Sequence, residues 1–357
     1  MARSSTYKNG STDYNQQRLK AWKPDLDAKT VLWSFLVIGF CFIPVGVLLL
    51  MASNNVHEVV LDYTYCLRIP QRDDLHYASS YLNCAGYIAH TPKPARCTCK
   101  VELNLPTGME GTVTIYYALS RFYQNHRHFL KSRDEYQLLG YVGGVSKSCS
   151  PFDSINHSII VPCGAFANAM FNDTIKLHMI SGNHEVPLLR TGLAWPLEKA
   201  LFKNPEGKPL NESYDGYVKP PSWSKNIWEM DQEIAFNNGM ENEDFIIWMR
   251  PSAFPDFRKV FRRIDQSVHW FQSGLPPGNY TFTIDYNYPV TPYRGRKYLV
   301  ISNDSAFGGK NPFLGIAYIA TGVCLIVTAL VLFIIHRRLG IREDEAIDVR
   351  KTDPYYW

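Results

Sequence analysis

Cysteine is the residue type in this chain whose number and spacing could support the most chemistry. The chain has eight cysteines among 357 residues. Cys41 and Cys324 lie inside long apolar runs, where a thiol packs as a small apolar group. The other six lie between those runs: Cys66, Cys84, Cys97, Cys99, Cys149 and Cys163. An even number predicts three disulfides in an oxidising compartment, and the sequence alone leaves fifteen possible pairings.

Two short spacings could instead hold a metal ion. Cys97 and Cys99 have one residue between them, whereas structural zinc sites prefer two or more between paired cysteines. His126 and His128 could ligate a metal from one strand, but no third ligand is near them in the sequence. We therefore favour disulfides and predict no metal site.

The common catalytic patterns are missing or incomplete. The sequence contains no glycine-rich phosphate loop ending in Gly-Lys-Ser/Thr, no His-Glu-x-x-His and no Gly-x-Ser-x-Gly. The stretch from Ser222 to Lys225 matches Ser-x-x-Lys, but it follows two prolines and has none of the companion motifs. We predict a protein that is not an enzyme and that binds no cofactor.

Asn-x-Ser/Thr triplets are the second feature with a chemical consequence, because they accept N-linked glycans in secreted segments. Five lie between the two apolar runs: Asn156, Asn172, Asn211, Asn279 and Asn303. The last is only ten residues before Phe313 and is a poor candidate. We predict glycans on Asn172 and Asn279, with Asn156 and Asn211 as further candidates.

Two apolar runs organise the chain. Residues 31–52 and 313–335 contain no Asp, Glu, Lys or Arg, and each is long enough to cross a bilayer as a helix. A cleaved signal peptide is a poorer interpretation of the first run, because thirty mostly polar residues precede it and no cleavage site follows closely. We assign residues 31–52 and 312–335 as transmembrane helices.

Positive charge flanks the two runs on their outer sides. The flanking residues are Arg18, Lys20, Lys23 and Lys29 before the first run, and Arg337, Arg338, Arg342 and Arg350 after the second. By the positive-inside rule, the tails at 1–30 and 336–357 are cytosolic, and residues 53–311 form a lumenal or extracellular domain. A sequon at Asn9 then lies on the cytosolic side and stays bare.

The segment between the spans is near neutral and has the patterns of a β-rich domain. Alternating or buried apolar stretches predict strands at 97–105, 111–119, 173–180, 244–249, 279–288 and 297–302. Residues 257–268 show helical spacing and predict an amphipathic helix, and 123–136 predicts a more polar one. Because no stretch combines a basic run with spaced aromatics, we exclude nucleic acid as a partner. The fold class is a two-span membrane protein with a mainly antiparallel β domain and short helices.

Both spans contain small residues that let another helix approach closely. They lack intramembrane charge, which excludes the usual proton relays and ion ligands. In the first span Gly39 and Gly46 flank Pro44. In the second, we predict that Gly315, Ala317 and Gly322 contact a helix of a partner protein.

Several blocks of sequence resemble one known family. They are Phe122-Tyr-Gln-Asn-His-Arg127 with Lys131-Ser-Arg-Asp134, Pro162-Cys-Gly-Ala165, Met170-Phe-Asn-Asp-Thr174, Asn242-Glu-Asp-Phe-Ile-Ile-Trp-Met-Arg250, Tyr286-Asn-Tyr-Pro-Val290 and Gly309-Lys-Asn-Pro-Phe-Leu-Gly-Ile-Ala-Tyr-Ile319. The chain resembles the accessory β subunits of type-IV P-type ATPases, also called the ligand-effect modulator or cell-division-control-fifty family.

The resemblance implies a one-to-one partner, a type-IV P-type ATPase that moves phospholipid from the exoplasmic to the cytosolic leaflet. The accessory subunit does not bind ATP, and it supports folding, exit from the endoplasmic reticulum and activity of the ATPase. Its membranes would be those of the endoplasmic reticulum, Golgi apparatus, endosomes or cell surface.

The resemblance also implies particular bonded and modified residues. The implied disulfides are Cys66 with Cys99, Cys84 with Cys97, and Cys149 with Cys163, and Asn172 matches a glycosylated position of the family. A subunit of a two-span ligand-gated cation channel remains the alternative, because such channels also have both ends inside and a cysteine-rich exterior.

Overall fold

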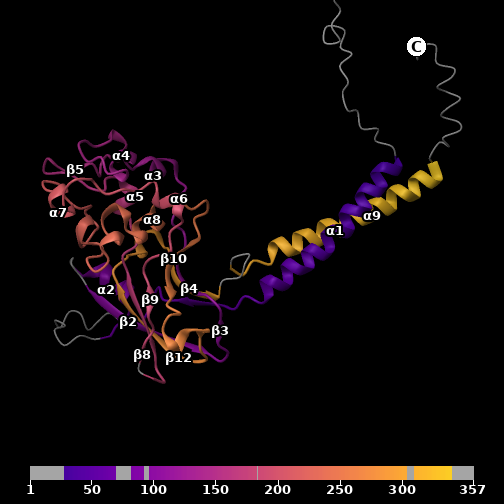
Figure 1. The fold of residues 1–357 in the computed structure, drawn as a ribbon, viewed down its shortest axis with the longest axis horizontal. Coiled ribbons are helices and arrows are strands. Elements are labelled where there is room, and N and C mark those ends of the chain that lie inside the picture. Colours follow the sequence, from indigo (N-terminus) through magenta and orange to yellow (C-terminus); the bar gives the residue numbers. More distant parts are fainter. Residues whose placement is uncertain (1–27, 70–81, 92–95, 183, 304–308, 340–357) are drawn as a thin grey trace, which may run out of the picture. The chain divides into compact units, whose positions relative to one another are not determined.

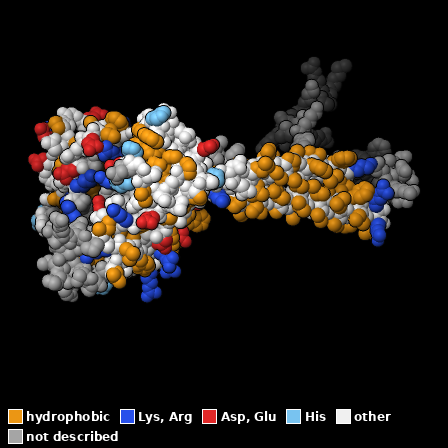
Figure 2. Space-filling view, turned by 90° about the horizontal axis from the view of Figure 1, so that it is seen from below, with side chains coloured by type: hydrophobic (Ala, Val, Ile, Leu, Met, Phe, Trp, Pro, Cys, Tyr) orange, Lys and Arg blue, Asp and Glu red, His pale blue; other side chains and the backbone are white. Residues whose placement is uncertain are grey.

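The computed structural model describes residues 28–69, 82–91, 96–182, 184–303 and 309–339. The chain divides into two compact units, of which one contains the spans and the other runs from Ser53 to Lys310. The spans are α1 (Ala28–Asn54) and α9 (Phe313–Leu339), each with a mean hydropathy of 2.7. The side chains on their visible surface are almost all hydrophobic, as Figure 2 shows, which suits a lipid environment.

Two antiparallel sheets form the domain between the spans (Figure 1). The five-stranded sheet has the order β1 (Glu58–Asp62), β13 (Lys297–Asn303), β4 (Val113–Leu119), β10 (Phe257–Ile264) and β9 (Leu188–Leu189). The four-stranded sheet has the order β2 (Cys97–Leu105), β12 (Gly278–Tyr286), β7 (Thr174–Met179) and β8 (His184–Glu185). Side chains from both sheets share one hydrophobic core. The predicted fold class, two spans around a mainly antiparallel β domain, is confirmed.

Short elements complete the domain. Two small ladders pair β3 (Met109–Glu110) with β11 (Gly274–Leu275), and β5 (Ser154–Ile155) with β6 (Ser158–Ile159). The helices are α2 (Cys84–His90), α3 (Arg127–Lys131), α4 (Glu135–Leu138), α5 (Ala165–Asn168), α6 (Pro196–Lys199), α7 (Leu210–Ser213) and α8 (Glu243–Met249). Single 3₁₀ turns lie at Lys147–Cys149, Ile227–Glu229, Ala235–Asn237, Gly239–Glu241, His269–Phe271 and Thr291–Tyr293.

The predicted helix at 257–268 is wrong, because residues 257–264 form strand β10, which lies between β4 and β9 in the larger sheet. Its pairing with β4 shifts register between Val260 and Arg262, which leaves one extra residue on β10. A β-bulge of this kind interrupts the two-residue alternation of a strand. The apolar residues before and after the bulge therefore fall three or four apart, which imitates the spacing of a helix.

The predicted strand at 244–249 is also wrong, because the segment forms helix α8. Its run of apolar residues is buried on all sides, so periodicity could not separate strand from helix. The deciding signal lies just before the run. The side-chain oxygen of Asn242 accepts a hydrogen bond from the backbone N–H of Phe245 at 3.1 Å, which is a helix N-cap.

A buried lysine closes the other end of α8. The ammonium group of Lys259, on β10, donates hydrogen bonds to the backbone carbonyls of Ile247 at 3.0 Å and Arg250 at 2.6 Å. Carbonyls at a helix C-terminus have no partner within the helix, and a cation there is favourable. Burial lowers the pKa of Lys259 well below its usual value. The lysine therefore fixes the helix on the strand.

The single polar helix predicted at 123–136 is two shorter helices. Helix α3 ends at Lys131, and α4 begins at Glu135. Between them, the carboxylate of Asp134 accepts a hydrogen bond from the backbone N–H of Tyr136 at 2.9 Å and so caps α4. The cap starts a new helix instead of continuing the first.

An ion pair in the interior joins the two sheets. The Lys297 ammonium group, on β13, lies 2.6 Å from a carboxylate oxygen of Asp173, just before β7, and both side chains are fully buried. The same carboxylate accepts hydrogen bonds from the Tyr63 hydroxyl at 3.0 Å and from the backbone N–H groups of Asn287 and Tyr288 at 2.6 and 2.7 Å. Every hydrogen-bonding direction of the buried carboxylate is thus occupied.

Burial lowers the pKa of Lys297 to about 8, although the nearby Asp173 carboxylate opposes the shift. Desolvation of the ammonium group therefore outweighs its attraction to the carboxylate. The ammonium group also lies 3.0 Å from the centroid of the Tyr286 ring, which supplies a cation–π contact. The network specifies how the sheets are joined more than it adds to their stability.

Replacing Lys297 by methionine should lower the free energy of unfolding by about 3–5 kcal/mol, because it leaves the Asp173 carboxylate buried without its cation. The double variant K297M/D173N should recover part of this loss. Unfolding of the detergent-purified chain, followed by tryptophan fluorescence, measures both effects. The matched control is R296M, the exposed neighbouring cation, which should change little. Equal stability of K297M and R296M would contradict the prediction.

Candidate functional site

The two membrane helices pack against each other through glycines. A Cβ atom added at Gly315 would lie 2.9 Å from the backbone nitrogen of Leu50 and 3.0 Å from the carbonyl oxygen of Gly46. One added at Gly322 would lie 3.0 Å from the carbonyl oxygen of Gly39. The two backbones are therefore in contact, and no larger residue fits at these positions without displacing a helix.

The buried positions of both helices repeat every seven residues. They are Leu32, Gly39, Gly46 and Ser53 in α1, and Gly315, Gly322 and Ala329 in α9. Since Gly39 faces Gly322 and Gly46 faces Gly315, the same antiparallel register places Leu32 opposite Ala329. A seven-residue repeat is the pattern of a left-handed supercoil. We call this line of contact the glycine seam.

The predicted membrane contact residues thus divide into two groups. Gly315 and Gly322 contact α1 of the same chain, while Ala317 is half-buried. The pairing of the two spans with each other was not predicted. The signal was present, since each span has two glycines seven residues apart. Contact of Ala317 with a partner protein stays a prediction.

The six lumenal cysteines form three disulfides in the structure. Cys66 is bonded to Cys99, Cys84 to Cys97 and Cys149 to Cys163, with Cα separations of 5.9, 5.5 and 5.6 Å. These are the pairs that the family resemblance implies. The sulfur atoms of Cys66, Cys84 and Cys99 all lie within 4.8 Å of one another, so the first two disulfides are adjacent. Together they attach Cys66, and Cys84 at the start of α2, to the first three residues of β2.

The sequons lie in different environments. Asn156 occupies the turn between β5 and β6, Asn211 lies on α7 and Asn279 lies on β12, and all three are exposed. Asn172 is half-buried. The side-chain amide of Asn303 is engaged at both ends, since it accepts from the N–H of His57 at 2.7 Å and donates to the carbonyl of Glu110 at 3.3 Å. The sequon at Asn9 lies outside the described residues.

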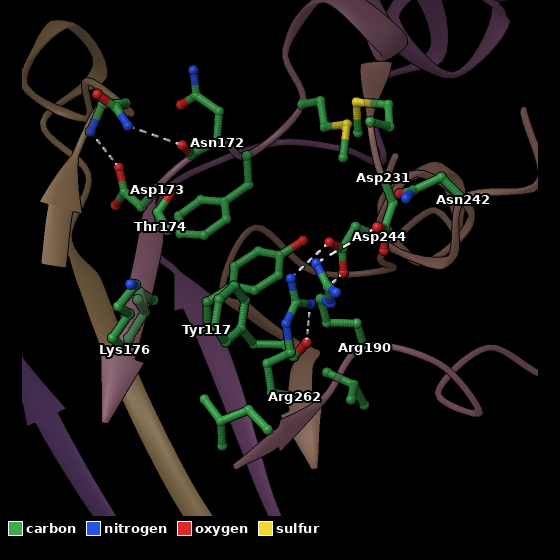
Figure 3. A pocket seen from close by; sticks show the side chains of 18 of the residues that line it. Tyr117, Asn172, Asp173, Thr174, Lys176, Arg190, Asp231, Asn242, Asp244 and Arg262 are labelled. Atoms are coloured by element: carbon green, nitrogen blue, oxygen red, sulfur yellow. Dashed lines mark hydrogen bonds and ion pairs between the residues drawn. The ribbon is translucent and has the colours of Figure 1, made fainter. Parts of the chain in front are cut away.

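A cavity of about 650 Å³ opens beside β7 and β10 (Figure 3). Arg262 makes two hydrogen bonds to the Asp244 carboxylate, at 2.5 and 2.9 Å. Arg190 lies 3.6 Å from the carboxylate of Asp231. Burial raises the pKa of Tyr117 well above its usual value, so its phenol stays neutral. Both arginines of the lining thus pair with carboxylates of the lining, which suits a structural role better than catalysis.

The residues weighed as catalytic or metal-binding do not form a site. His126 and His128 are exposed at the start of α3, with ring centroids 5.6 Å apart. The ammonium group of Lys225 donates to the carbonyl oxygen of Met230 at 2.7 Å. Ser222 is exposed, and its backbone N–H donates to the side chain of Asn168 at 3.0 Å. Among the described residues, no hydrogen bond joins Ser222 to Lys225, and no third ligand lies beside the two histidines.

The chain matches known proteins over nearly its whole length. The family model described as the LEM3 (ligand-effect modulator 3) family / CDC50 family matches residues 49–340, which include most of the domain and the second span. The chain belongs to the LEM3/CDC50 family.

Curated members of the LEM3/CDC50 family are similar across animals and plants. Cell cycle control protein 50A of Mus musculus is 41% identical over 345 residues, which cover 94% of this chain and 91% of that protein. Cell cycle control protein 50B of Homo sapiens is 37% identical over 94% of this chain and 95% of its own length. ALA-interacting subunit 3 of Arabidopsis thaliana is 33% identical, with 95% and 90% covered. Membership of this family supports an accessory-subunit role.

Isoleucine at both Gly315 and Gly322 should separate the two helices, because the added side chains have no space against the backbone of α1. Cysteines placed by L32C and A329C report the contact. We expect them to form a cross-link under mild oxidation in membranes, and we expect G315I/G322I to lose most of it.

The matched control is A320I/T321I, which places the same two isoleucine side chains on the exposed face of α9 and should leave the cross-link intact. Cys41 and Cys324 are replaced by alanine throughout, so that only the new thiols react. A cross-link that survives G315I/G322I would contradict the glycine seam.

Proposed function

We propose that this chain is the non-catalytic accessory subunit of a type-IV P-type ATPase. It pairs one to one with that ATPase and is needed for its folding, its exit from the endoplasmic reticulum and its activity. The ATPase moves phospholipid from the exoplasmic to the cytosolic leaflet. The observation that carries the proposal is the LEM3/CDC50 family match, which extends over residues 49–340.

The structure supports this role through the design of the membrane unit. The glycine seam joins α1 and α9 into a helical pair with no Asp or Glu and with basic residues only near its ends. Such a pair has no ion ligand or proton relay of the usual intramembrane kind. Its outer faces remain covered with hydrophobic side chains, which are available to lipid or to helices of a partner (Figure 2).

An accessory subunit without chemistry of its own acts by binding. It stabilises the folded ATPase, or one conformation in the transport cycle, only by as much as it binds that state better than the alternatives. A domain held by three disulfides and a buried ion pair changes shape little, so little ordering entropy opposes its association. This rigidity suits a protein that supports the conformations of another.

The proposed topology places both termini in the cytosol and residues 53–311 in the lumen or outside the cell. Arg337 and Arg338 in the last turn of α9 agree with a cytosolic end at that side. The proposed compartments are the endoplasmic reticulum, Golgi apparatus, endosomes and cell membrane. The three disulfides fit an oxidising compartment for the domain.

Purification in mild detergent tests the proposed partner. We expect the tagged chain to bring down a single much larger polypeptide in a one-to-one complex with lipid-stimulated ATPase activity, whereas the chain alone should hydrolyse no ATP. A317F should reduce co-purification through the outer part of α9 while leaving the cross-link across the glycine seam unchanged.

A homo-oligomer that conducts cations would favour the channel alternative over this proposal. Normal export and activity of all type-IV ATPases in cells that lack the chain would also overturn it. A317F paired with the cross-link assay separates a lost partner contact from a damaged membrane unit.

Glycan mapping tests the topology independently of the partner. We expect glycans on Asn172 and Asn279, and none on Asn9, because only the segment between the spans meets the glycosylation machinery. Mass shifts after glycosidase treatment of wild type and of the N172Q and N279Q variants measure occupancy. A glycan on Asn9 would mean that the orientation is inverted.

A further inference from the structure

Three arginines line a second hollow, of about 480 Å³, beside the ends of two inner strands of the five-stranded sheet. They are Arg121, Arg294 and Arg296, and Tyr65, Tyr298 and Asp256 also line the hollow. We call it the arginine pocket. It lies where β4 ends and β13 begins, since Leu119 of β4 is paired with Lys297 of β13.

Two of the arginines have an unusual backbone conformation. Arg121 has a φ of 57° and Arg294 a φ of 55°, in the left-handed region. Among the described residues other than glycine, only Asn156 and His157 share this conformation, and they form the hairpin turn between β5 and β6. Left-handed backbone is unfavourable for a residue with a Cβ and persists where surrounding structure holds it. Both arginines with this conformation line the same pocket.

Hydrogen bonds hold the two loops in place. The N–H of Arg121 donates to the Asp256 carboxylate at 2.8 Å, and the N–H of Arg294 donates to the carbonyl of Thr291 at 3.0 Å. The N–H of Arg296 donates to the Ser120 hydroxyl at 2.9 Å. These bonds fix the backbone of all three arginines without using the guanidinium groups of Arg121 and Arg294.

A glycine brings the loops together. A Cβ added at Gly295 would lie 2.7 Å from the carbonyl oxygen of Ser120 and 2.2 Å from the ring of Tyr293. Only glycine allows the 290–296 loop to approach the 119–122 loop so closely. The arginines therefore converge because the fold places them there.

The cations of this pocket outnumber its carboxylates. The guanidinium groups of Arg121 and Arg294 are exposed and have no hydrogen-bond or ion-pair partner within the part of the chain that the structure describes. Arg296 lies 3.4 Å from the carboxylate of Asp62. Asp256 is the one carboxylate in the lining, against three cations. In the cavity beside β10, by contrast, the arginines are paired with carboxylates.

We propose that the arginine pocket binds a phosphate ester. Each guanidinium group offers a planar fork of N–H donors that matches the oxygens of phosphate, and several forks around one hollow suit a tetrahedral group with two or three terminal oxygens. A single carboxylate needs only one fork. The hollow is larger than a bare phosphate ion and leaves space for the organic part of the ester beside Tyr65 and Tyr298.

The phosphate ester could belong to a soluble metabolite or to a phospholipid head group, and the shared chemistry is the phosphate. Isothermal titration of the full-length chain in a phosphate-free, uncharged detergent distinguishes these sources. The probes are inorganic phosphate, glycerol 3-phosphate and dihexanoylphosphatidylserine below its micelle concentration. We expect saturable binding of at least one ester, weakened on the order of tenfold or more in R121Q/R294Q, because each lost bidentate contact contributes about that factor.

The matched control is K100Q/K176Q, which removes the same charge from exposed positions on either side of Thr283 in the other sheet. It should bind the ester as the wild type does. R121K/R294K keeps the charge but loses the forks, and it should bind more weakly than wild type. Unchanged unfolding midpoints show that each variant is folded.

Binding of glycerol 3-phosphate assigns a soluble ester, and binding of the short-chain lipid alone assigns a lipid head group; either supports the proposal. No saturable binding to any of the three probes would overturn it. So would equal weakening in K100Q/K176Q and R121Q/R294Q. Succinate or a polyglutamate peptide that binds more tightly than the esters would assign the pocket to carboxylates of a protein partner, which contradicts a phosphate site.

Discussion

The buried contact between Lys297 and Asp173 is the constraint on which the domain depends. A charged group in the interior is costly unless every direction around it is satisfied, and this requirement fixes several segments at once. Lys297 belongs to the five-stranded sheet, whereas Asp173 precedes a strand of the other sheet. The carboxylate of Asp173 also accepts hydrogen bonds from the backbone N–H groups of the two residues after β12. A small displacement of one sheet relative to the other would leave a buried charge without a partner.

Buried polar groups elsewhere in the domain also have hydrogen-bond partners. Lys259 closes the C-terminus of α8 and Asn242 caps its N-terminus, so both ends of this buried helix are satisfied by side chains from neighbouring segments. One disulfide lies outside the main hydrophobic core, whereas the cysteines of the other two belong to it. The bond between Cys149 and Cys163 lies in a small separate cluster with Ile160, where a cross-link restricts a loop that few apolar contacts would hold.

The membrane unit depends on a different physical effect. Lipid tails are as apolar as the side chains of a transmembrane helix, so the hydrophobic effect gives two helices no reason to associate there. Glycines remove the side chains between the backbones, and close van der Waals contact then provides the attraction. Gly315 and Gly322 are used for this internal contact, so the proposed contact with another protein is left to other residues.

The sequence by itself determined the features that depend on local composition. Two charge-free runs predicted the spans, and alternation predicted strands at 97–105 and 279–288, because a half-buried strand leaves a two-residue period. A run of buried apolar residues predicted the strand at 297–302. The orientation that the positive flanks indicate stays a prediction. The number of lumenal cysteines predicted disulfides but not their partners. The family resemblance supplied the pairs, since pairing depends on which segments meet in space.

Only the tertiary structure decided the features that depend on a distant neighbour. The bulge in β10 is defined by its pairing with β4, and in the sequence it resembles a helix. The apolar run of α8 has no periodicity because every side is covered by other elements. The sequence predicted Gly315 and Gly322 as contacts for a partner protein, whereas in the structure they face the glycines of α1. Lys297 and Asp173 are 124 residues apart, so no local pattern could show that their charges meet.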